Sequence, residues 1–338
     1  MIGPNEVNVV SPSASESAEH PPTDHLLSVR GLSVDYFDRD DPVHAVRGVS
    51  FDLRRGETLG IVGESGCGKS TLITALTRLL RPPAVLTGGS AVFHPPSGEP
   101  VDILGCDDKQ LRSLRWEQLA IVFQSAMNAL NPVHRLATQF VDVIRAHRDC
   151  TKADANDRAR ELLGMVGISA DRLRAYPHEL SGGMRQRATI ALALACEPEI
   201  IVMDEPTTAV DVVMQRQILK HITTLKRQLG FAIVFVTHDL SLLLEIADRI
   251  AVMYAGKIVE LASAEQLYRA PLHPYSQALG DCFPPLRGPR RVLRGIGGSP
   301  PGLRQPPSGC AFHPRCPKRF DPCDTTAPEL VDVRTDAG

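Results

Sequence analysis

The chain has 338 residues, of which 43% are apolar and 22% charged, and its formal net charge at pH 7 is −2. This composition is typical of a globular protein and excludes a collagen-like, wholly disordered or small disulfide-stapled chain. The small net charge gives no global field that would attract nucleic acid, so no nucleic-acid partner is expected. The longest apolar stretches, around 190–196 and 232–236, are shorter than the roughly 18–20 residues that span a bilayer. We therefore expect a soluble, intracellular protein that reaches a membrane only through a partner.

Residues 1–24 are rich in Ser, Pro and Glu and contain no Lys or Arg. They lack the basic segment followed by an apolar one that marks a signal peptide. They also carry too little apolar surface to offset the entropy lost on ordering. We expect a disordered N-terminal arm here.

From residue 26 onward, strand-like and helix-like patterns alternate. Strand-like stretches begin near 26 and 44, and a short apolar strand then leads through a Gly-rich turn into a helix that stops at Pro82 and Pro83. Further strands are predicted at 118–124, 199–206 and 231–239, with helices over most of 125–180 and at 181–196, 212–230 and 241–250, and a small hairpin after them. This alternation predicts a parallel, doubly wound sheet. Residues 271–338 become rich in Pro, Arg and Cys, which indicates a C-terminal extension.

The segment GESGCGKST fits the pattern G-x-x-x-x-G-K-[ST] between a predicted strand and a predicted helix. Glycines allow the backbone to turn so that several N–H groups face one point, and the helix start adds positive potential there. Lys69 can bridge the β- and γ-phosphates, and Ser70 can offer its hydroxyl to Mg²⁺. Cys67 is interpreted as a small loop side chain rather than a redox switch. The predicted nucleotide-binding residues are Gly63, Glu64, Ser65, Gly66, Cys67, Gly68, Lys69, Ser70 and Thr71.

Two further strands end in side chains suited to phosphate chemistry. EIIVMDEP places Asp204 and Glu205 at the carboxyl end of an apolar strand, where open α/β sheets bind ligands. Asp204 is predicted to hold Mg²⁺ through water, and Glu205 to polarise the attacking water as a general base. VFVTHD ends the next strand at His238, which is predicted to reach the γ-phosphate region.

The segment LSGGMRQR, at 180–187, distinguishes between the classes of P-loop protein. With it, residues 26–262 resemble the ATP-binding subunits of ABC transporters in the order and spacing of their motifs. Ser181 offers a hydroxyl and a helix N-cap, and the glycines after it allow backbone N–H groups to approach an anion. The resemblance implies that two subunits pack head to tail, so that this segment contacts the ATP of the partner subunit. The signature residues are then Leu180, Ser181, Gly182, Gly183 and Met184.

The resemblance implies further roles. Gln124 looks like the residue that contacts Mg²⁺ or its water, which gives Ser70, Gln124 and Asp204 as the magnesium set. Asp211 is the acid of a loop that crosses the dimer interface, and Glu205 and His238 are the catalytic pair of an ATPase. Tyr36 is predicted to stack on adenine, with Phe37 as the alternative.

The implied fold is an ABC cassette of the P-loop NTPase class. It would have a RecA-like parallel-sheet core, an antiparallel β subdomain and an α-helical subdomain. The cassette is expected over 25–262, with the helical subdomain at about 125–180, and the Cys/Pro/Arg-rich extension over 263–338.

The tail motifs HPYSQAL, GSPPGL and PSGCAFHPRCPKRFDPC resemble the C-terminal domain of the oligopeptide/dipeptide importer branch. Met184 followed by Arg185 looks like the D-type subunit of a D/F pair. This implies a paralogous F-type ATPase, two membrane permease subunits, an extracytoplasmic substrate-binding protein, and a peripheral location at the cytoplasmic face of the membrane. Peptides are the expected cargo, with nickel or glutathione as alternatives. A non-transport ABC ATPase is the alternative from another class, although such proteins usually carry insertions or two cassettes.

Four cysteines gather in the last fifth of the chain. Their spacing matches no compact C-x-x-C pattern, so the residues alone give a weak signal for metal binding. The resemblance implies a [4Fe–4S] cluster in some members, and zinc or reduced structural cysteines are the alternatives. The candidate ligands are Cys282, Cys310, Cys316 and Cys323, with His313 as a substitute for Cys282.

Overall fold

The structure is a computed structural model that describes residues 24–37, 41–124, 129–207, 211–282 and 295–333. Nearly all of the N-terminal arm expected at 1–24 therefore lies outside the described residues. So does part of the loop between Pro206 and Asp211.

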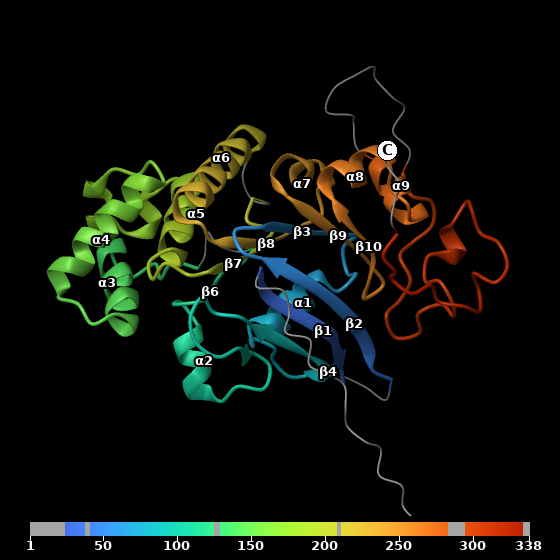
Figure 1. Ribbon diagram of the computed structural model, residues 1–338. Helices are drawn as coiled ribbons and strands as arrows, with labels where there is room; N and C mark the ends of the chain where they lie inside the picture. Colours follow the sequence, from blue (N-terminus) through green and yellow to red (C-terminus); the bar gives the residue numbers. More distant parts are fainter. Residues whose placement is uncertain (1–23, 38–40, 125–128, 208–210, 283–294, 334–338) are drawn as a thin grey trace, which may run out of the picture.

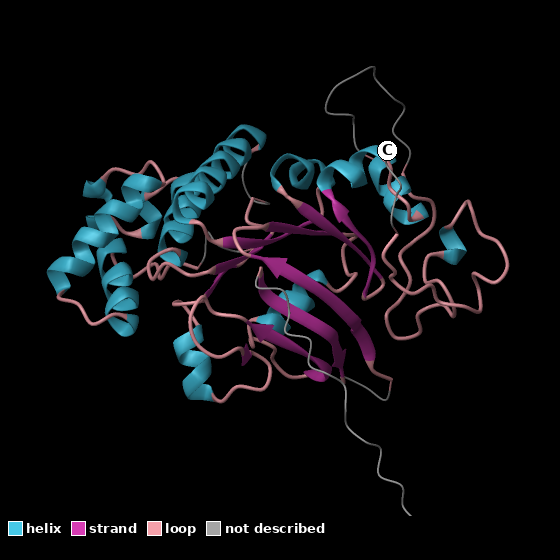
Figure 2. Cartoon of the chain, viewed as in Figure 1, coloured by secondary structure: helices cyan, strands magenta, loops and turns pink. Residues whose placement is uncertain are grey.

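Within the described residues, the strands form two sheets (Figure 2). In the larger sheet, the neighbours β9, β3, β8, β7 and β6 pair in parallel, and β10 pairs antiparallel with β9. Its strands, in spatial order, are β10 (Lys257–Ser263), β9 (Arg249–Tyr254), β3 (Thr58–Val62), β8 (Ala232–Thr237), β7 (Ile200–Asp204) and β6 (Leu119–Val122). The smaller, antiparallel sheet contains, in spatial order, β2 (Val43–Arg54), β1 (His25–Tyr36), β4 (Ala84–Phe93) and β5 (Val101–Asp102).

The large sheet is covered on both faces, which explains why its strands are apolar throughout. Every residue of β7 is buried. Since successive side chains of a strand point to opposite faces, Ile201 and Met203 join one hydrophobic core, while Ile200 and Val202 join the other. The first core includes helices α3 to α6, and the second includes α1 and the antiparallel sheet. The expected parallel core and antiparallel β subdomain are both present.

The helices fall into groups around the sheets (Figure 1). Helices α3 and α4 pack against each other at one end of the molecule, and α7, α8 and α9 lie near β9 and β10 at the other. The bounds are α1 (Lys69–Leu76), α2 (Asp108–Leu114), α3 (Leu136–His147), α4 (Lys152–Met165), α5 (Gly182–Ala193), α6 (Val212–Leu229), α7 (Leu240–Ile246), α8 (Ala264–Arg269) and α9 (Pro274–Asp281), with 3₁₀ turns at Ala170–Arg174, Pro177–Glu179 and His313–Arg315. No helix in the described ranges is both long and apolar enough to span a membrane.

Helix α6 shows how the sequence sets its own boundaries. The Asp211 side chain accepts hydrogen bonds from the backbone N–H groups of Val213 and Met214 and so caps the first turn. At the other end Gly230 adopts a left-handed φ of 79°, which glycine tolerates best and which terminates the helix. The prediction of a helix closed by Gly230 is confirmed.

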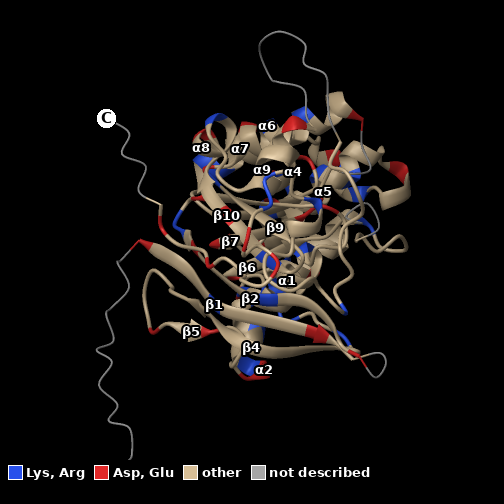
Figure 3. Ribbon diagram, turned by 90° about the vertical axis from the view of Figure 1, so that its right-hand side faces the viewer, with Lys and Arg blue, Asp and Glu red and all other residues tan. Residues whose placement is uncertain are grey.

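The C-terminal extension begins with α8 and α9, and its later described part, residues 295–333, is mostly loop and lies beside β10 (Figure 1). Three buried aromatic rings attach it to the cassette. The Phe312 ring lies 5.3 Å from that of Tyr254 on β9 and 5.4 Å from that of Tyr275 on α9, measured between centroids. Acidic and basic residues are interspersed over the elements in Figure 3, in keeping with the small net charge.

We expect Phe312→Ala to loosen the extension. Removing a buried phenylalanine typically lowers the free energy of unfolding by about 3–5 kcal/mol. Limited proteolysis should then cleave residues 295–333 faster, and chemical denaturation should show the loss of stability. Phe320→Ala is the matched control, because Phe320 is 69% exposed. Equal stability of the two variants would contradict this account of the attachment.

Candidate nucleotide-binding site

The predicted phosphate loop connects β3 to α1, as the motif requires. Gly68 precedes the helix with φ of 105°, and a Cβ at this position would lie 2.1 Å from the backbone oxygen of Ala45 on β2. A Cβ at Gly63 would lie 2.2 Å from the backbone oxygen of Met253 on β9. Both positions therefore require glycine, because the loop is held between two strands of different sheets.

Lys69 is almost fully buried inside this loop. Its ammonium donates hydrogen bonds to the backbone oxygens of Gly63, at 2.7 Å, and Glu64, at 2.9 Å. The side chain thus folds over the loop and satisfies its charge with loop carbonyls. Cys67 is also buried, and burial raises the pKa of its thiol despite the nearby lysine. This agrees with the interpretation of Cys67 as a small loop side chain.

Two of the three predicted magnesium residues, Ser70 and Asp204, come together at the carboxyl edge of the sheet, while Gln124 bonds to Glu205. The Ser70 hydroxyl donates to Asp204 Oδ1 at 3.4 Å. Asp204 ends β7 and is 6% exposed, and this burial raises the pKa of its carboxyl. A hydroxyl and a carboxylate are hard oxygen donors of the kind that Mg²⁺ prefers.

Glu205 lies at the centre of a three-residue network. Its Oε2 accepts a hydrogen bond from Gln124 Nε2 at 2.9 Å, and its Oε1 lies 3.1 Å from His238 Nδ1. An ionised carboxylate can only accept, so Nδ1 carries the hydrogen in this arrangement. Glu205 has a left-handed φ of 44°, a strained conformation for a residue with a side chain. Its backbone N–H is fixed by the oxygen of Val236 on β8.

The two aromatic candidates for adenine have different surroundings. Tyr36 ends β1, and its hydroxyl lies 3.1 Å from Thr71 Oγ1 in the first turn of α1. Its ring is therefore beside the phosphate loop. Phe37 is 50% exposed, and no such contact to the loop is found for it among the described residues. Stacking of Tyr36 on adenine stays a prediction, with Phe37 as the alternative.

The signature segment forms the start of a different helix. Ser181 caps α5, and its hydroxyl accepts from the backbone N–H of Met184 at 3.2 Å. Leu180 is buried, whereas Ser181 is exposed. In the described ranges, no hydrogen bond or ion pair joins residues 180–184 to residues 63–71. The two phosphate-binding segments therefore do not share a site through direct contact within one chain.

Gln186 connects α5, which begins at the signature segment, to the residues that follow β7. It is buried on α5, and its amide donates to the backbone oxygen of Pro206, directly after Glu205. Asp211, predicted at the dimer interface, is exposed and caps α6.

Comparisons with known proteins agree with this geometry. A family model described as "ABC transporter" matches residues 46–208, and one described as "Oligopeptide/dipeptide transporter, C-terminal region" matches residues 259–323. The chain is 43% identical to the probable peptide ABC transporter ATP-binding protein y4tR of Sinorhizobium fredii, over 93% of this chain and 94% of that one. It is 42% identical to the dipeptide transport ATP-binding protein DppD of Bacillus subtilis, over 92% of each chain.

The chain belongs to the ABC transporter ATP-binding proteins, in the oligopeptide/dipeptide branch. A third relative of this ABC protein, the oligopeptide transport ATP-binding protein OppD of Escherichia coli, is 42% identical over 90% of this chain and 89% of that one. Among solved structures, the cassette MJ0796, in a dimer bound to ADP and Pi, superposes with a TM-score of 0.62. It is 27% identical and covers 70% of this chain and 98% of its own.

The tail cysteines of this ABC protein do not support the predicted metal centre. Among the residues that the structure describes, no group of three or more His, Cys, Asp or Glu side chains is placed to hold one metal ion. Cys282 lies at the end of α9, where its thiol donates to the oxygen of Ala278, while Cys310 pairs through its backbone with Cys323. Burial raises the pKa of the Cys310 thiol, and Cys323 and Cys316 raise it further. The iron–sulfur or zinc site expected from the resemblance is therefore unsupported, with or without His313.

The extension contacts the phosphate loop, which was not predicted from the sequence. Arg315 forms an ion pair with Glu64, and the Tyr275 hydroxyl accepts from the backbone N–H of Glu64. These partners are more than 200 residues apart in the chain. The spacing of residues in the sequence carries no signal for such pairs.

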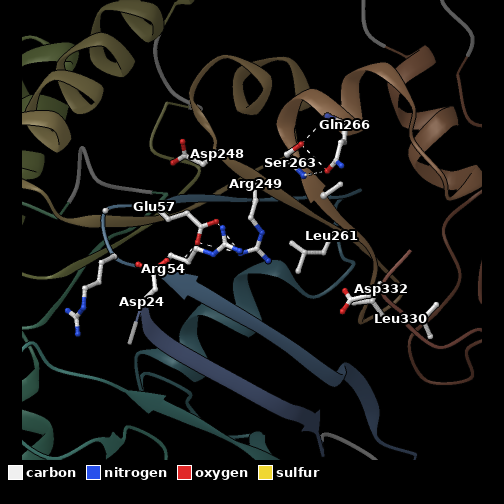
Figure 4. A pocket seen from close by; sticks show the side chains of 14 residues that line it. Asp24, Arg54, Glu57, Asp248, Arg249, Leu261, Ser263, Gln266, Leu330 and Asp332 are labelled. Carbon is white, nitrogen blue, oxygen red and sulfur yellow. Dashed lines mark hydrogen bonds and ion pairs between the residues drawn. The ribbon is translucent and has the colours of Figure 1, made fainter. Parts of the chain in front are cut away.

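A separate pocket of about 830 Å³ lies at the opposite, amino edge of the sheet (Figure 4). Glu57, just before β3, and Arg249, which begins β9, line it and form an ion pair at 3.1 Å. Ligands of open α/β sheets bind at the carboxyl edge. This pocket is therefore distinct from the nucleotide site of the ABC cassette.

We expect Tyr36→Ala to weaken ATP binding by about 1–3 kcal/mol, the contribution of one aromatic ring stacked on a base. Tyr36→Phe should retain most of the affinity, because the ring remains. Calorimetric titration of the full chain with a non-hydrolysable ATP analogue measures both. Phe37→Ala is the control and should bind normally. Weakened binding by this control, with normal binding by Tyr36→Ala, would instead assign the stacking ring to Phe37.

Proposed function

We propose that this ABC ATPase hydrolyses ATP at the interface of two cassettes packed head to tail, and that this cycle drives the uptake of peptides. The supporting observation is the separation of its two half-sites. Lys69, Ser70, Asp204 and Glu205 converge at one sheet edge, while Ser181 caps a different helix. In the described part of the chain, no hydrogen bond or ion pair joins Ser181 to the phosphate loop. In this proposal, a second cassette supplies the signature segment that completes the site around each ATP.

In this proposal, the phosphate loop binds the triphosphate through its backbone N–H groups and the start of α1. The Lys69 ammonium exchanges its loop carbonyls for phosphate oxygens and neutralises their charge. Ser70, Asp204 and Gln124 would hold Mg²⁺, which would supply further positive charge at the β- and γ-phosphates. Ser181 and the N–H groups after it would contact the phosphates held by the partner.

Glu205 is the general base for the attacking water in this scheme. Its carboxylate accepts the water's proton, while Gln124 and His238 hold the carboxylate in place. The backbone N–H of Glu205 also donates to the oxygen of Val236 on β8, and this hydrogen bond restricts the backbone position of the base. His238 is 58% exposed along its side chain, so it is accessible to the γ-phosphate region.

The cargo and partners are proposed from the relatives. Their names specify peptide, dipeptide and oligopeptide transport. We propose a complex with two membrane permease subunits and an extracytoplasmic substrate-binding protein, with this chain peripheral at the cytoplasmic face. The second cassette would be a paralogous F-type subunit. The cassette would span residues 25–262, with its helical subdomain at about 125–180 and the extension at 263–338.

We expect Glu205→Gln to lower ATP turnover by at least about 100-fold, the usual scale for loss of a general base. ATP binding should persist, because the amide is isosteric and Lys69 is unchanged. Phosphate release and size-exclusion chromatography with ATP, in the presence of the partner cassette, should show inactive, ATP-bound dimers. Unchanged hydrolysis would contradict the assignment of Glu205.

The transport role is tested by reconstitution with the co-expressed membrane subunits and the binding protein. Labelled dipeptides and longer peptides should accumulate in vesicles only with ATP and wild-type chain, and the Glu205→Gln complex is the matched control. Accumulation of nickel or glutathione without peptide would contradict the proposed cargo.

A further inference from the structure

The C-terminal extension reaches into the phosphate loop through one ion pair. Arg315 Nη1 donates to Glu64 Oε2 at 2.7 Å, and Nη2 donates to Oε1 at 3.0 Å. This paired geometry is the strong form of an arginine–carboxylate contact. The Arg315 side chain is only 6% exposed and that of Glu64 is 23% exposed. The contact is therefore largely shielded from solvent, unlike a typical surface salt bridge.

Arg315 is itself held rigidly. Its Nε donates to the backbone oxygen of Gly297 at 2.8 Å, and Nη1 also donates to the Tyr254 hydroxyl at 3.2 Å. Its guanidinium lies over the Tyr254 and Phe312 rings, at 5.9 and 6.0 Å from their centroids. Its hydrogen bonds to Glu64 are the main cause of the raised pKa of Arg315. The guanidinium thus has a fixed position set by the extension and by β9.

Glu64 is held from a second direction. Its backbone N–H donates to the Tyr275 hydroxyl at 3.0 Å, and Tyr275 is fully buried on α9. The residue is therefore fixed at its backbone and at its carboxylate by residues beyond 262. Because Glu64 immediately follows Gly63 in the loop, these contacts also restrict the first turn of the phosphate cradle.

A third contact brings the extension against the same loop. Residues 300–303 line a pocket of about 340 Å³ together with residues 64–67 and Val43. The backbone oxygen of Leu303 accepts from the N–H of His44 at 2.9 Å. The extension thus packs along one side of the loop and along the start of β2.

Glu64 places a carboxylate within the loop that is proposed to bind the phosphates of ATP. An unpaired carboxylate at this position would repel the phosphates of ATP, because like charges in a partly buried site are weakly screened. A guanidinium paired with it cancels this repulsion and keeps the carboxylate directed toward the extension. The pair therefore affects both the charge and the shape of the loop.

We infer that Arg315 is a positioning residue for ATP binding, which acts through Glu64 on the phosphate loop. The extension is then a part of the nucleotide site and not only an appended module. This inference rests on the proposed placement of the ATP phosphates at Lys69.

The test measures the affinity of the full chain for a non-hydrolysable ATP analogue by calorimetry, with the melting temperature of each variant alongside. Arg315→Gln should weaken binding roughly tenfold, the scale of one lost charged hydrogen bond. The double variant Glu64→Gln with Arg315→Gln should recover most of this affinity, because the uncompensated carboxylate is then absent. Arg319→Gln is the matched control and should bind normally, since Arg319 pairs with Asp324 in the exposed part of the extension.

Wild-type affinity in Arg315→Gln would overturn the inference. So would a loss that the double variant fails to recover, because damage to packing alone is not repaired by removing a second charge. If Arg315→Gln yields no folded protein, Arg315→Met decides the question: it keeps apolar bulk against the Tyr254 and Phe312 rings but removes the charge opposite Glu64, and unchanged affinity would overturn the inference.

Lys69→Ala separates this inference from the proposed site. Normal affinity in Lys69→Ala would refute the placement of the phosphates, and the inference with it. Lost affinity in Lys69→Ala, with normal affinity in Arg315→Gln, would refute the role of Arg315 alone.

Discussion

Parallel pairing of β3, β8 and β7 positions the groups of the nucleotide site. Val62 pairs with Thr237 on β8, and Asp204 pairs with Val236 on the same strand. Three segments that are distant in the chain therefore end at one edge of the sheet. The phosphate loop follows β3, Glu205 follows β7 and His238 follows β8. Since each strand is buried on both faces, its register is fixed by the two cores and the edge is rigid.

Local motifs in the sequence predicted this edge well. The phosphate loop, the acidic strand and the histidine that follows the next strand each carry their information within a few residues, so they could be identified before any contact was known. Helix α6 was likewise predicted with its closing glycine, whereas its Asp211 cap was found only in the structure. The antiparallel sheet followed from the family resemblance, because the alternating pattern by itself indicated only parallel strands.

Other features lay beyond local reasoning. No element was predicted over 84–117, where the structure has β4, β5 and α2. Strand β4 is half exposed along its length, so its pattern lacks the continuous apolar run that marked the central strands. For the tail cysteines, residue type suggested a shared metal site, but the described side chains do not form one. The contact of Arg315 with Glu64 depends on the folding of the whole chain.

The bond between Gln186 and Pro206 has a mechanical consequence. It joins the helix that begins at Ser181 to the backbone next to Glu205, across two elements that are otherwise separate in sequence. A rotation of α5, imposed from outside by a subunit docked on the neighbouring helices, would pull on the peptide group beside the base. The same hydrogen bond would couple the two elements in the other direction, so that a shift of the backbone beside Glu205 would move α5 and the helices packed on it.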